Sequence, residues 1–394
     1  MSDRRPARLF LAALFLLLAW GAFAFGAEYA WAYAPLLIWA AVTGLLGWIA
    51  SPADRLPARA FFAALSVVFL AVLLQLAPAP RPLVARVSPA RVAVDYDALH
   101  AAATMQGPDG DRAPRARVPL SIAPSRTALG LAFLGALTIL LAGCTRGFAA
   151  TGVRPVARGI LLLGVAAALT GIVQKASGSE LVYGFWHQRQ PQGVFAPFNN
   201  RNHFAGWAVM GLALGAGYLG GCLARALRGV RPDWRHRLLW FSTPAASETL
   251  LAGLGLAVMA AAVVLSASRS GVLCLMFVLA LFIGLVLRRQ ATRSRRAIGV
   301  AYVIVLLVLA AIWGGVDAVL QRFRQFEPSM EGRFAVWRET LAIVRDFPLT
   351  GTGLNTYGIA MLHYQQGGVA AAVRSLAATA RARGSATAAP GFAA

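Results

Sequence analysis

Long apolar runs recur along this chain, and polar and charged residues gather in the segments between them. A run of about 20 apolar residues is long enough to cross the hydrocarbon core of a bilayer as a helix. The pattern therefore predicts an all-α fold, a polytopic transmembrane helical bundle of about nine spans. The predicted spans are 9–26, 30–50, 58–77, 127–145, 156–174, 203–223, 248–265, 271–287 and 297–316.

Arginine is concentrated before the first predicted span and after every second span that follows. If all the spans are real, these clusters lie on one side of the membrane, and the positive-inside rule makes that side cytoplasmic. The N-terminus is then cytoplasmic. The clusters are Arg4–Arg8, Arg55–Arg59, Arg146–Arg158, Arg225–Arg237 and Arg288–Arg296.

Composition supports a membrane protein, because 58% of the 394 residues are hydrophobic and 13% are charged, against about 25% charged in soluble domains. The net charge of +22 comes from basic residues that are all arginine except Lys175, and much of this arginine falls in short loops. No nucleic-acid motif accompanies it, so no nucleic-acid partner is expected. Cys144, Cys222 and Cys274 have the spacing of neither a metal site nor a disulfide framework. The basic start and first apolar run resemble a signal peptide, but the run is too long, which predicts an uncleaved helix.

The spans divide the chain into five predicted regions. Residues 1–77 form N-terminal transmembrane helices, 78–126 a polar excursion on the non-cytoplasmic side, and 127–316 a core transmembrane domain. Residues 317–366 form a large non-cytoplasmic loop with an amphipathic helix over Glu331–Asp346, and 367–394 a low-complexity tail. The stripe of Phe334, Trp337, Leu341 and Val344 on this helix is typical of helix packing or of contact with the membrane surface.

Polar residues Asn199–His203 stand directly before the span at 203–223, on the predicted non-cytoplasmic side. Arg201 among them, and Arg269 before the span at 271–287, oppose the positive-inside rule. Arginine presents a planar fork of donors that suits phosphate oxygens, and a helix N-terminus also favours an anion. The pattern predicts that Arg201 and Arg269 bind a diphosphate. Supporting roles are predicted for Asn199, Asn202, His203, Lys175 and Arg333.

Simpler interpretations of the same residues stay open. Arg201 and Lys175 are also typical of interfacial anchors, and Arg269 of a tight turn. Gly351-Thr352-Gly353 lacks the Gly-Lys-Ser/Thr that completes a phosphate loop, which predicts a plain turn. No His, Cys, Asp and Glu cluster has metal-ligand spacing, so neither a metal nor a cofactor is expected.

Three motifs in series resemble the O-antigen ligase/polymerase superfamily of bacterial inner-membrane proteins. They are Phe198–Ala205, Leu265–Gly271, and Gly332-Arg333 with Trp337 and Asp346–Leu354, within roughly residues 160–360. The resemblance implies transfer of a glycan from an undecaprenyl-diphosphate carrier to a glycan or lipid acceptor at the periplasmic face, among membrane lipids. It implies a metal-independent inverting glycosyltransferase that serves lipopolysaccharide or polysaccharide synthesis. In the family, arginines matching Arg201 and Arg269 hold the diphosphate.

The chain departs from the family's pattern after the third motif. The family's loop continues to a His-Asn pair that supplies a candidate general base, whereas His363 here is followed by the Ala- and Arg-rich tail. No catalytic base is therefore predicted, and a truncation or frame shift near Gly367 is expected. The alternatives are a secondary transporter of an anionic solute and an inactive truncated family member. A transporter is typically marked by charged residues near the bilayer midplane, and these spans are nearly free of charge.

Overall fold

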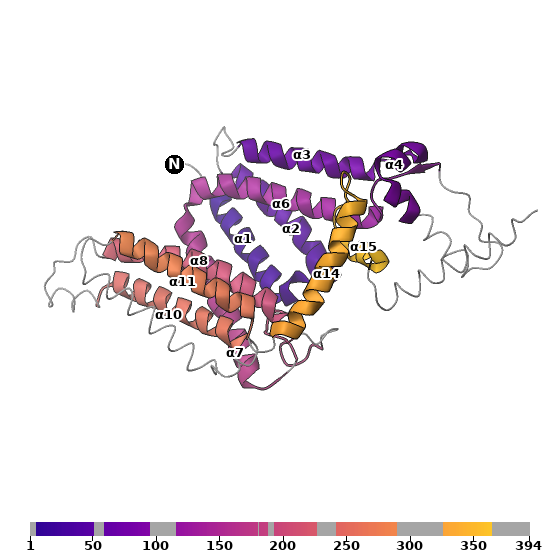
Figure 1. Cartoon of the computed structure of the whole chain (residues 1–394). Helices are drawn as coiled ribbons and strands as arrows, with labels where there is room; N and C mark the ends of the chain where they lie inside the picture. Colours follow the sequence, from indigo (N-terminus) through magenta and orange to yellow (C-terminus); the bar gives the residue numbers. More distant parts are fainter. Residues whose placement is uncertain are drawn as a thin grey trace, which may run out of the picture. The chain divides into compact units, whose positions relative to one another are not determined.

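Helices make up nearly all the regular structure in the computed structural model of the chain (Figure 1), which describes residues 5–50, 59–94, 116–179, 181–187, 193–226, 242–289 and 326–364. Seven helices in these ranges are long and apolar enough to cross a membrane, and each coincides with one of the first seven predicted spans. They are α1 (Arg5–Phe23), α2 (Ala30–Ile49), α3 (Arg59–Leu76), α6 (Pro124–Thr151), α7 (Val153–Ala176), α8 (Arg201–Ala226) and α10 (Pro244–Leu265).

The remaining two predicted spans have different outcomes. The span at 271–287 corresponds to α11 (Arg269–Arg289). Its apolar part, Arg269–Phe282, is shorter than the seven helices of membrane length. The span at 297–316 lies outside the described residues, as does the tail at 367–394. The chain is thus a multi-pass helical membrane protein.

Helix ends follow local chemistry that can be read from the sequence. Pro124 and Pro244 stand at the first positions of α6 and α10, where the missing N–H costs no hydrogen bond. Thr243 caps α10, because its Oγ1 accepts from the N–H of Ala246 at 3.3 Å. Gly152, at a φ of 73°, separates α6 from α7.

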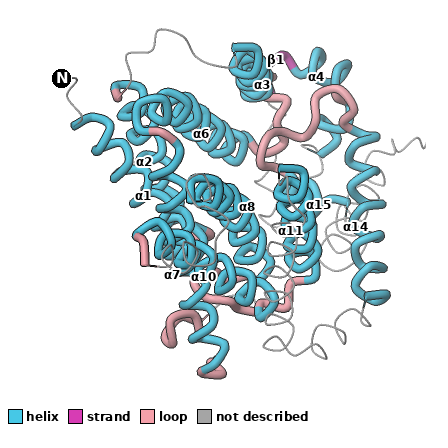
Figure 2. The backbone as a smooth tube through the Cα atoms, turned by 90° about the vertical axis from the view of Figure 1, so that its left-hand side faces the viewer, coloured by secondary structure: helices cyan, strands magenta, loops and turns pink. Residues whose placement is uncertain are grey.

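The chain divides into two compact units, and the division falls within α6. Unit 1 comprises Met1–Leu56 and Ile139–Phe326, and so contains α1, the 3-10 helix η1 (Phe25–Ala27), α2, the later part of α6, α7, α8, α10 and α11. Its main apolar core lies where α8 packs against α7 and α10 (Figures 1 and 2), around Leu161, Phe204 and Met259.

Glycines set how closely the helices of unit 1 approach one another. A Cβ on Gly44 of α2 would lie 2.4 Å from the carbonyl oxygen of Ile139, and one on Gly143 would lie 1.9 Å from that of Gly44. The backbones of α2 and α6 therefore meet directly, as small residues allow between membrane helices.

Unit 2 comprises Pro57–Thr138 and Glu327–Ala394. It contains α3, α4 (Arg81–Val87), the first part of α6, α14 (Phe326–Asp346) and α15 (Tyr357–Tyr364). Strands β1 (Ala79–Pro80) and β2 (Arg117–Val118) pair antiparallel, with Ala79 opposite Val118. Buried Ile343, Phe347 and Ala360 form its core together with Ala90 and Ile122.

The predicted polar excursion at 78–126 packs, in its described parts, against the turn that follows α14. Gly353 has a φ of 113°, and a Cβ there would lie 2.6 Å from the side-chain oxygens of both Ser121 and Thr127. Only glycine fits this position. The chain bends at Thr352, between Gly351 and Gly353, which agrees with the predicted turn. Helix α14 begins at Phe326, five residues before the predicted start at Glu331.

Candidate functional site

The loop 193–200 brings the chain to the start of α8. Gly193 has a φ of 81°, and its carbonyl accepts from the N–H of Arg201 at 3.0 Å. Between them Phe195 and Phe198 pair through their backbones, and the N–H of Phe198 donates to the carbonyl of Phe195 at 3.0 Å. Both rings are buried against Phe204 of α8. The loop is therefore closed on itself and anchored by aromatic packing.

Two polar side chains tie this loop to the rest of unit 1. The Oε1 of Gln174 in α7 accepts from the N–H of Ala196 at 2.7 Å, and Nε2 of Gln174 donates to the carbonyl of Ser179 at 3.2 Å. The Nδ2 of Asn199 donates to Oε2 of Glu28, between α1 and α2, at 3.0 Å. Gly171 leaves room for the Phe195 ring, since a Cβ there would lie 2.0 Å from the ring.

Arg201 is the first residue of α8, as the sequence predicts, and its side chain folds back over the loop. A Cβ on Gly193 would lie 2.7 Å from Nη1 of Arg201, so glycine at 193 makes space for the half-buried guanidinium. The Oδ1 of Asn200 accepts from the N–H of Asn202 at 2.8 Å and caps the helix. The guanidinium therefore belongs to the N-terminal end of α8, where the helix dipole favours an anion.

Helix α11 begins beside this end of α8. The Oγ of Ser268 donates to Oδ1 of Asn202 at 2.8 Å and accepts from the N–H of Gly271 at 3.2 Å, so one hydroxyl caps α11 and joins it to α8. A Cβ on Gly271 would lie 2.5 Å from that of Ala205. Arg201 is therefore the sequence neighbour of Asn202, and Arg269 is the sequence neighbour of Ser268, so each predicted arginine stands next to one partner in this hydrogen bond.

The other predicted site residues fall in two places. His203 is exposed on the first turn of α8, and Lys175 is exposed in the last turn of α7, next to Gln174. Asn199 is buried in the loop. Arg333 lies in α14 of unit 2, where its side chain is outside the described set. Unit 1 therefore gathers Asn199, Arg201, Asn202, His203, Lys175 and Arg269, and Arg333 is not among them.

Sequence reasoning missed Glu28 and the bridging role of Ser268. Glu28 is the sole acidic residue between positions 5 and 50, and a lone carboxylate between two apolar spans is a signal that could have found it. Ser268 lies within the motif Leu265–Gly271. Its partner 66 positions earlier in the chain becomes apparent only when α8 and α11 are packed.

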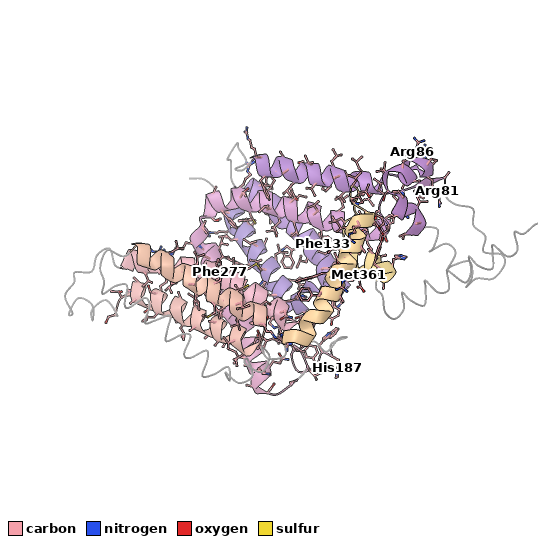
Figure 3. All side chains as sticks on the ribbon, viewed as in Figure 1. Arg81, Arg86, Phe133, His187, Phe277 and Met361 are labelled. Carbon is pink, nitrogen blue, oxygen red and sulfur yellow. The ribbon has the colours of Figure 1, made fainter. Side chains whose placement is uncertain are left out.

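A pocket of about 550 Å³ lies beside the loop in unit 1. Its lining includes the apolar Leu169 and Val173 of α7 and the polar Gln174, Ser179 and Tyr183. Tyr183 donates to the carbonyl of Phe23 at 2.6 Å, and burial raises the pKa of its phenol to about 12, so the phenol stays protonated at neutral pH. His187, a few residues further on, is exposed (Figure 3).

This arrangement suits the binding of an anion. Two arginines stand at the N-terminal ends of adjacent helices. Glu28, the carboxylate that contacts the loop, accepts a hydrogen bond from Asn199.

At the opposite end of these helices, Arg154 of α7 pairs with Glu248 of α10 at 2.6 Å, and Tyr218 of α8 donates a hydrogen bond to the same carboxylate. The two ends of this helix group therefore differ: one carries an ion pair, and the other carries the predicted anion site.

The family model of the O-antigen ligase matches residues 254–375. This match supports membership of the O-antigen ligase/polymerase superfamily. The match includes most of α10, the Ser266–Gly271 turn with Arg269, α11, α14 and α15, and it extends past Gly367. Arg201 and α8 lie before it. The match to the O-antigen ligase family indicates glycan transfer in general, with a lipid-linked glycan and an acceptor as the general kinds of partner. Neither a curated protein nor a solved structure matches the chain.

Proposed function

We propose that the protein transfers a glycan from an undecaprenyl-diphosphate carrier to an acceptor sugar or lipid at the periplasmic face of the bacterial inner membrane. The observation that carries this proposal is the hydrogen bond between Asn202 and Ser268, which joins the first turns of α8 and α11. Through it Arg201 and Arg269 stand at two neighbouring helix N-termini, and a diphosphate has two phosphoryl groups to bind.

The chemistry requires stabilisation of a leaving group that gains negative charge. As the bond between the anomeric carbon and the diphosphate oxygen breaks, the electron pair remains on the diphosphate. Guanidinium groups and helix N-termini placed there before the reaction stabilise that charge. The acceptor hydroxyl attacks the opposite face of the anomeric carbon and loses its proton to a general base. This single displacement inverts the configuration, and the arginines supply positive charge without a metal ion.

The orientation rests on the two different ends of unit 1. Arg154, Arg225 and Glu248 lie at the ends of α7, α8 and α10 that the arginine pattern assigns to the cytoplasm. The first turn of α8, with Arg201, stands at the opposite end of the same helix. This supports a periplasmic site and a cytoplasmic N-terminus.

The test uses the full-length protein in proteoliposomes with a labelled undecaprenyl-diphosphate glycan and an acceptor, and it follows both glycan transfer and release of the free carrier. Arg201→Ala and Arg269→Ala are each expected to lower the transfer rate by about 10²-fold or more. The matched control is Arg158→Ala, since Arg158 is exposed at the other end of unit 1 and is expected to leave the rate unchanged. Wild-type rates in both site variants would refute the proposed role.

A further inference from the structure

Helix α14 of unit 2 has two apolar sides, one buried in the core of the unit and one exposed. Ile343 and Phe347 are 7% and 4% exposed in the core of unit 2, and Thr340 next to that side shares a hydrogen bond with the hydroxyl of Tyr357. The second side is the stripe of Phe334, Trp337, Leu341 and Val344, whose exposed fractions lie between 52% and 57%. Packing within unit 2 therefore accounts for one apolar side of α14 and leaves the stripe open.

The turn after α14 is bound to the ends of two helices of membrane length. The Nε2 of Gln75, near the end of α3, donates to the carbonyl of Thr350 at 2.8 Å, and its Oε1 accepts from the N–H of Leu354 at 3.3 Å. The Nδ2 of Asn355 donates to the carbonyl of Arg126, in the first turn of α6, at 3.3 Å. The end of α14 therefore lies at the level where α3 ends and α6 begins.

That level is the boundary of the hydrocarbon layer. Val72 is the one residue of α3 that is buried, and the exposed Val67, Leu70 and Leu74 require lipid around them. Directly after α3, helix α4 carries Arg81 and Arg86 (Figure 3), and charged groups of this kind mark the polar side of the boundary.

The direction of α14 agrees with a position along this boundary. Helix α3 is seen along its length in Figure 1 and end-on in Figure 2, whereas α14 is seen along its length in both. Helix α14 therefore runs across the direction of α3. A helix that crosses the direction of a membrane span, at the level where that span ends, follows the plane of the membrane surface.

The charges on α14 complement a lipid surface. Arg338 follows Phe334 by four residues and Arg345 follows Leu341 by four, so each arginine lies beside the stripe on the helix surface. Both arginines are exposed. An apolar stripe that contains Trp and Phe and is flanked by arginine is typical of helices that lie in the interface of a bilayer.

We propose that α14 is an interfacial helix that docks on the surface of the lipid bilayer. The stripe enters the region between headgroups and acyl chains, and Arg338 and Arg345 contact phosphate groups of the lipids. The docking partner is the bilayer, because the turn bound to the ends of α3 and α6 already holds α14 at its surface. This inference is independent of the proposed catalytic role of Arg201 and Arg269.

Lipid contact can be measured at single positions of the full-length protein. With Cys144, Cys222 and Cys274 replaced by alanine, Trp337→Cys and Leu341→Cys are labelled with an environment-sensitive fluorophore. The matched control is Ala335→Cys, which is exposed on α14 but off the stripe. In nanodiscs whose lipids carry a nitroxide near the headgroup, quenching at positions 337 and 341 is expected to be several-fold stronger than at 335. Equal quenching at 335 and 337, or crosslinking of position 337 to a second copy of the chain, would overturn the proposal.

A second measurement tests the arginines. Arg338→Gln together with Arg345→Gln is expected to weaken lipid quenching at position 337 in nanodiscs of phosphatidylcholine and phosphatidylglycerol in equal parts. In phosphatidylcholine alone the loss is expected to be smaller, because the attraction to anionic headgroups is absent. Both side chains are exposed, so the double variant is expected to fold as the wild type does. Its helical content and elution volume check this. Unchanged quenching at position 337 in both lipids would refute the role given to the arginines.

Discussion

The hydroxyl of Ser268 donates a hydrogen bond of 2.8 Å to Oδ1 of Asn202 and so joins the first turn of α11 to the first turn of α8. Ser268 is 1% exposed, and the same oxygen caps α11 through the N–H of Gly271. One buried hydroxyl therefore sets the position of two helix N-termini. The neighbours of this pair in sequence are Arg201 and Arg269, on which the proposed diphosphate site depends.

Ser268→Ala tests this bond directly. The change leaves Oδ1 of Asn202 without its donor and the N–H of Gly271 without its cap. It is expected to lower the free energy of unfolding by about 1–3 kcal/mol and to reduce glycan transfer while both arginines remain. Ser270→Ala is the control: Ser270 is exposed on the same turn, and the change removes a long contact of 3.5 Å with Oγ of Ser268 while leaving Ser268 and its bond to Asn202 in place. The measurements are thermal unfolding in detergent and the transfer rate. Equal behaviour of the two variants would contradict the bridging role.

Gly271→Ala tests the close approach of α11 to α8. The new Cβ would lie 2.5 Å from that of Ala205, so the helices must separate. The expected cost is about 1–3 kcal/mol of stability. Gly206→Ala is the matched control: it lies in α8 with nothing within 4 Å of an added Cβ, and alanine there is expected to be neutral or to stabilise the helix by up to about 1 kcal/mol. Thermal unfolding of both variants measures the difference, which would vanish if the approach were unimportant.

Gln174 is expected to be sensitive to the kind of substitution. Its Oε1 accepts from the N–H of Ala196, and its Nε2 donates to the carbonyl of Ser179. Gln174→Leu leaves both backbone groups without their partner at a buried position, at about 1–3 kcal/mol each. Gln174→Glu keeps the acceptor for Ala196, so it is expected to retain more activity than Gln174→Leu. The comparison of transfer rates checks this, and the opposite order would rule out an anchoring role for the acceptor.

The half-buried phenol of Tyr183 is expected to make the stability of the wild-type protein fall at high pH relative to that of Tyr183→Phe. Burial raises the pKa of its phenol from about 10 to about 12, so the folded state favours the protonated form. The unfolded chain loses this proton at a lower pH than the folded one. The resulting stabilisation is present in full below about pH 10 and falls as pH rises toward about 12. Tyr183→Phe has no proton to lose.

The unfolding temperature of Tyr183→Phe relative to wild type is therefore expected to be constant from pH 7 to about pH 9 and to rise above about pH 10. The constant difference at lower pH reports loss of the hydrogen bond to Phe23. A pH-independent difference up to pH 11 would show that the phenol is not shielded as the structure indicates.

Local patterns in the sequence predicted the helices well. The starts of α8 and α11 follow from the polar residues before each apolar run, and Arg201 and Arg269 were expected at these positions. The start of α14 was wrong by five residues, because the helix includes Pro328 in its first turn, where proline costs no hydrogen bond. Family membership was also expected from short motifs, and the O-antigen ligase match over 254–375 confirms it.

The sequence by itself determined which segments are helices of membrane length, because length and apolar character are properties of each segment alone. The tertiary structure decided which segments meet: Asn202 with Ser268, Asn199 with Glu28, and Gln75 with Thr350. These contacts depend on close approaches such as that of Gly271 to Ala205, and a sequence pattern that repeats within one helix carries no record of which other helix it packs against. Arg201 and Arg269 could therefore be picked out singly from the sequence, while their neighbours became a hydrogen-bonded pair only through the packing of α8 and α11.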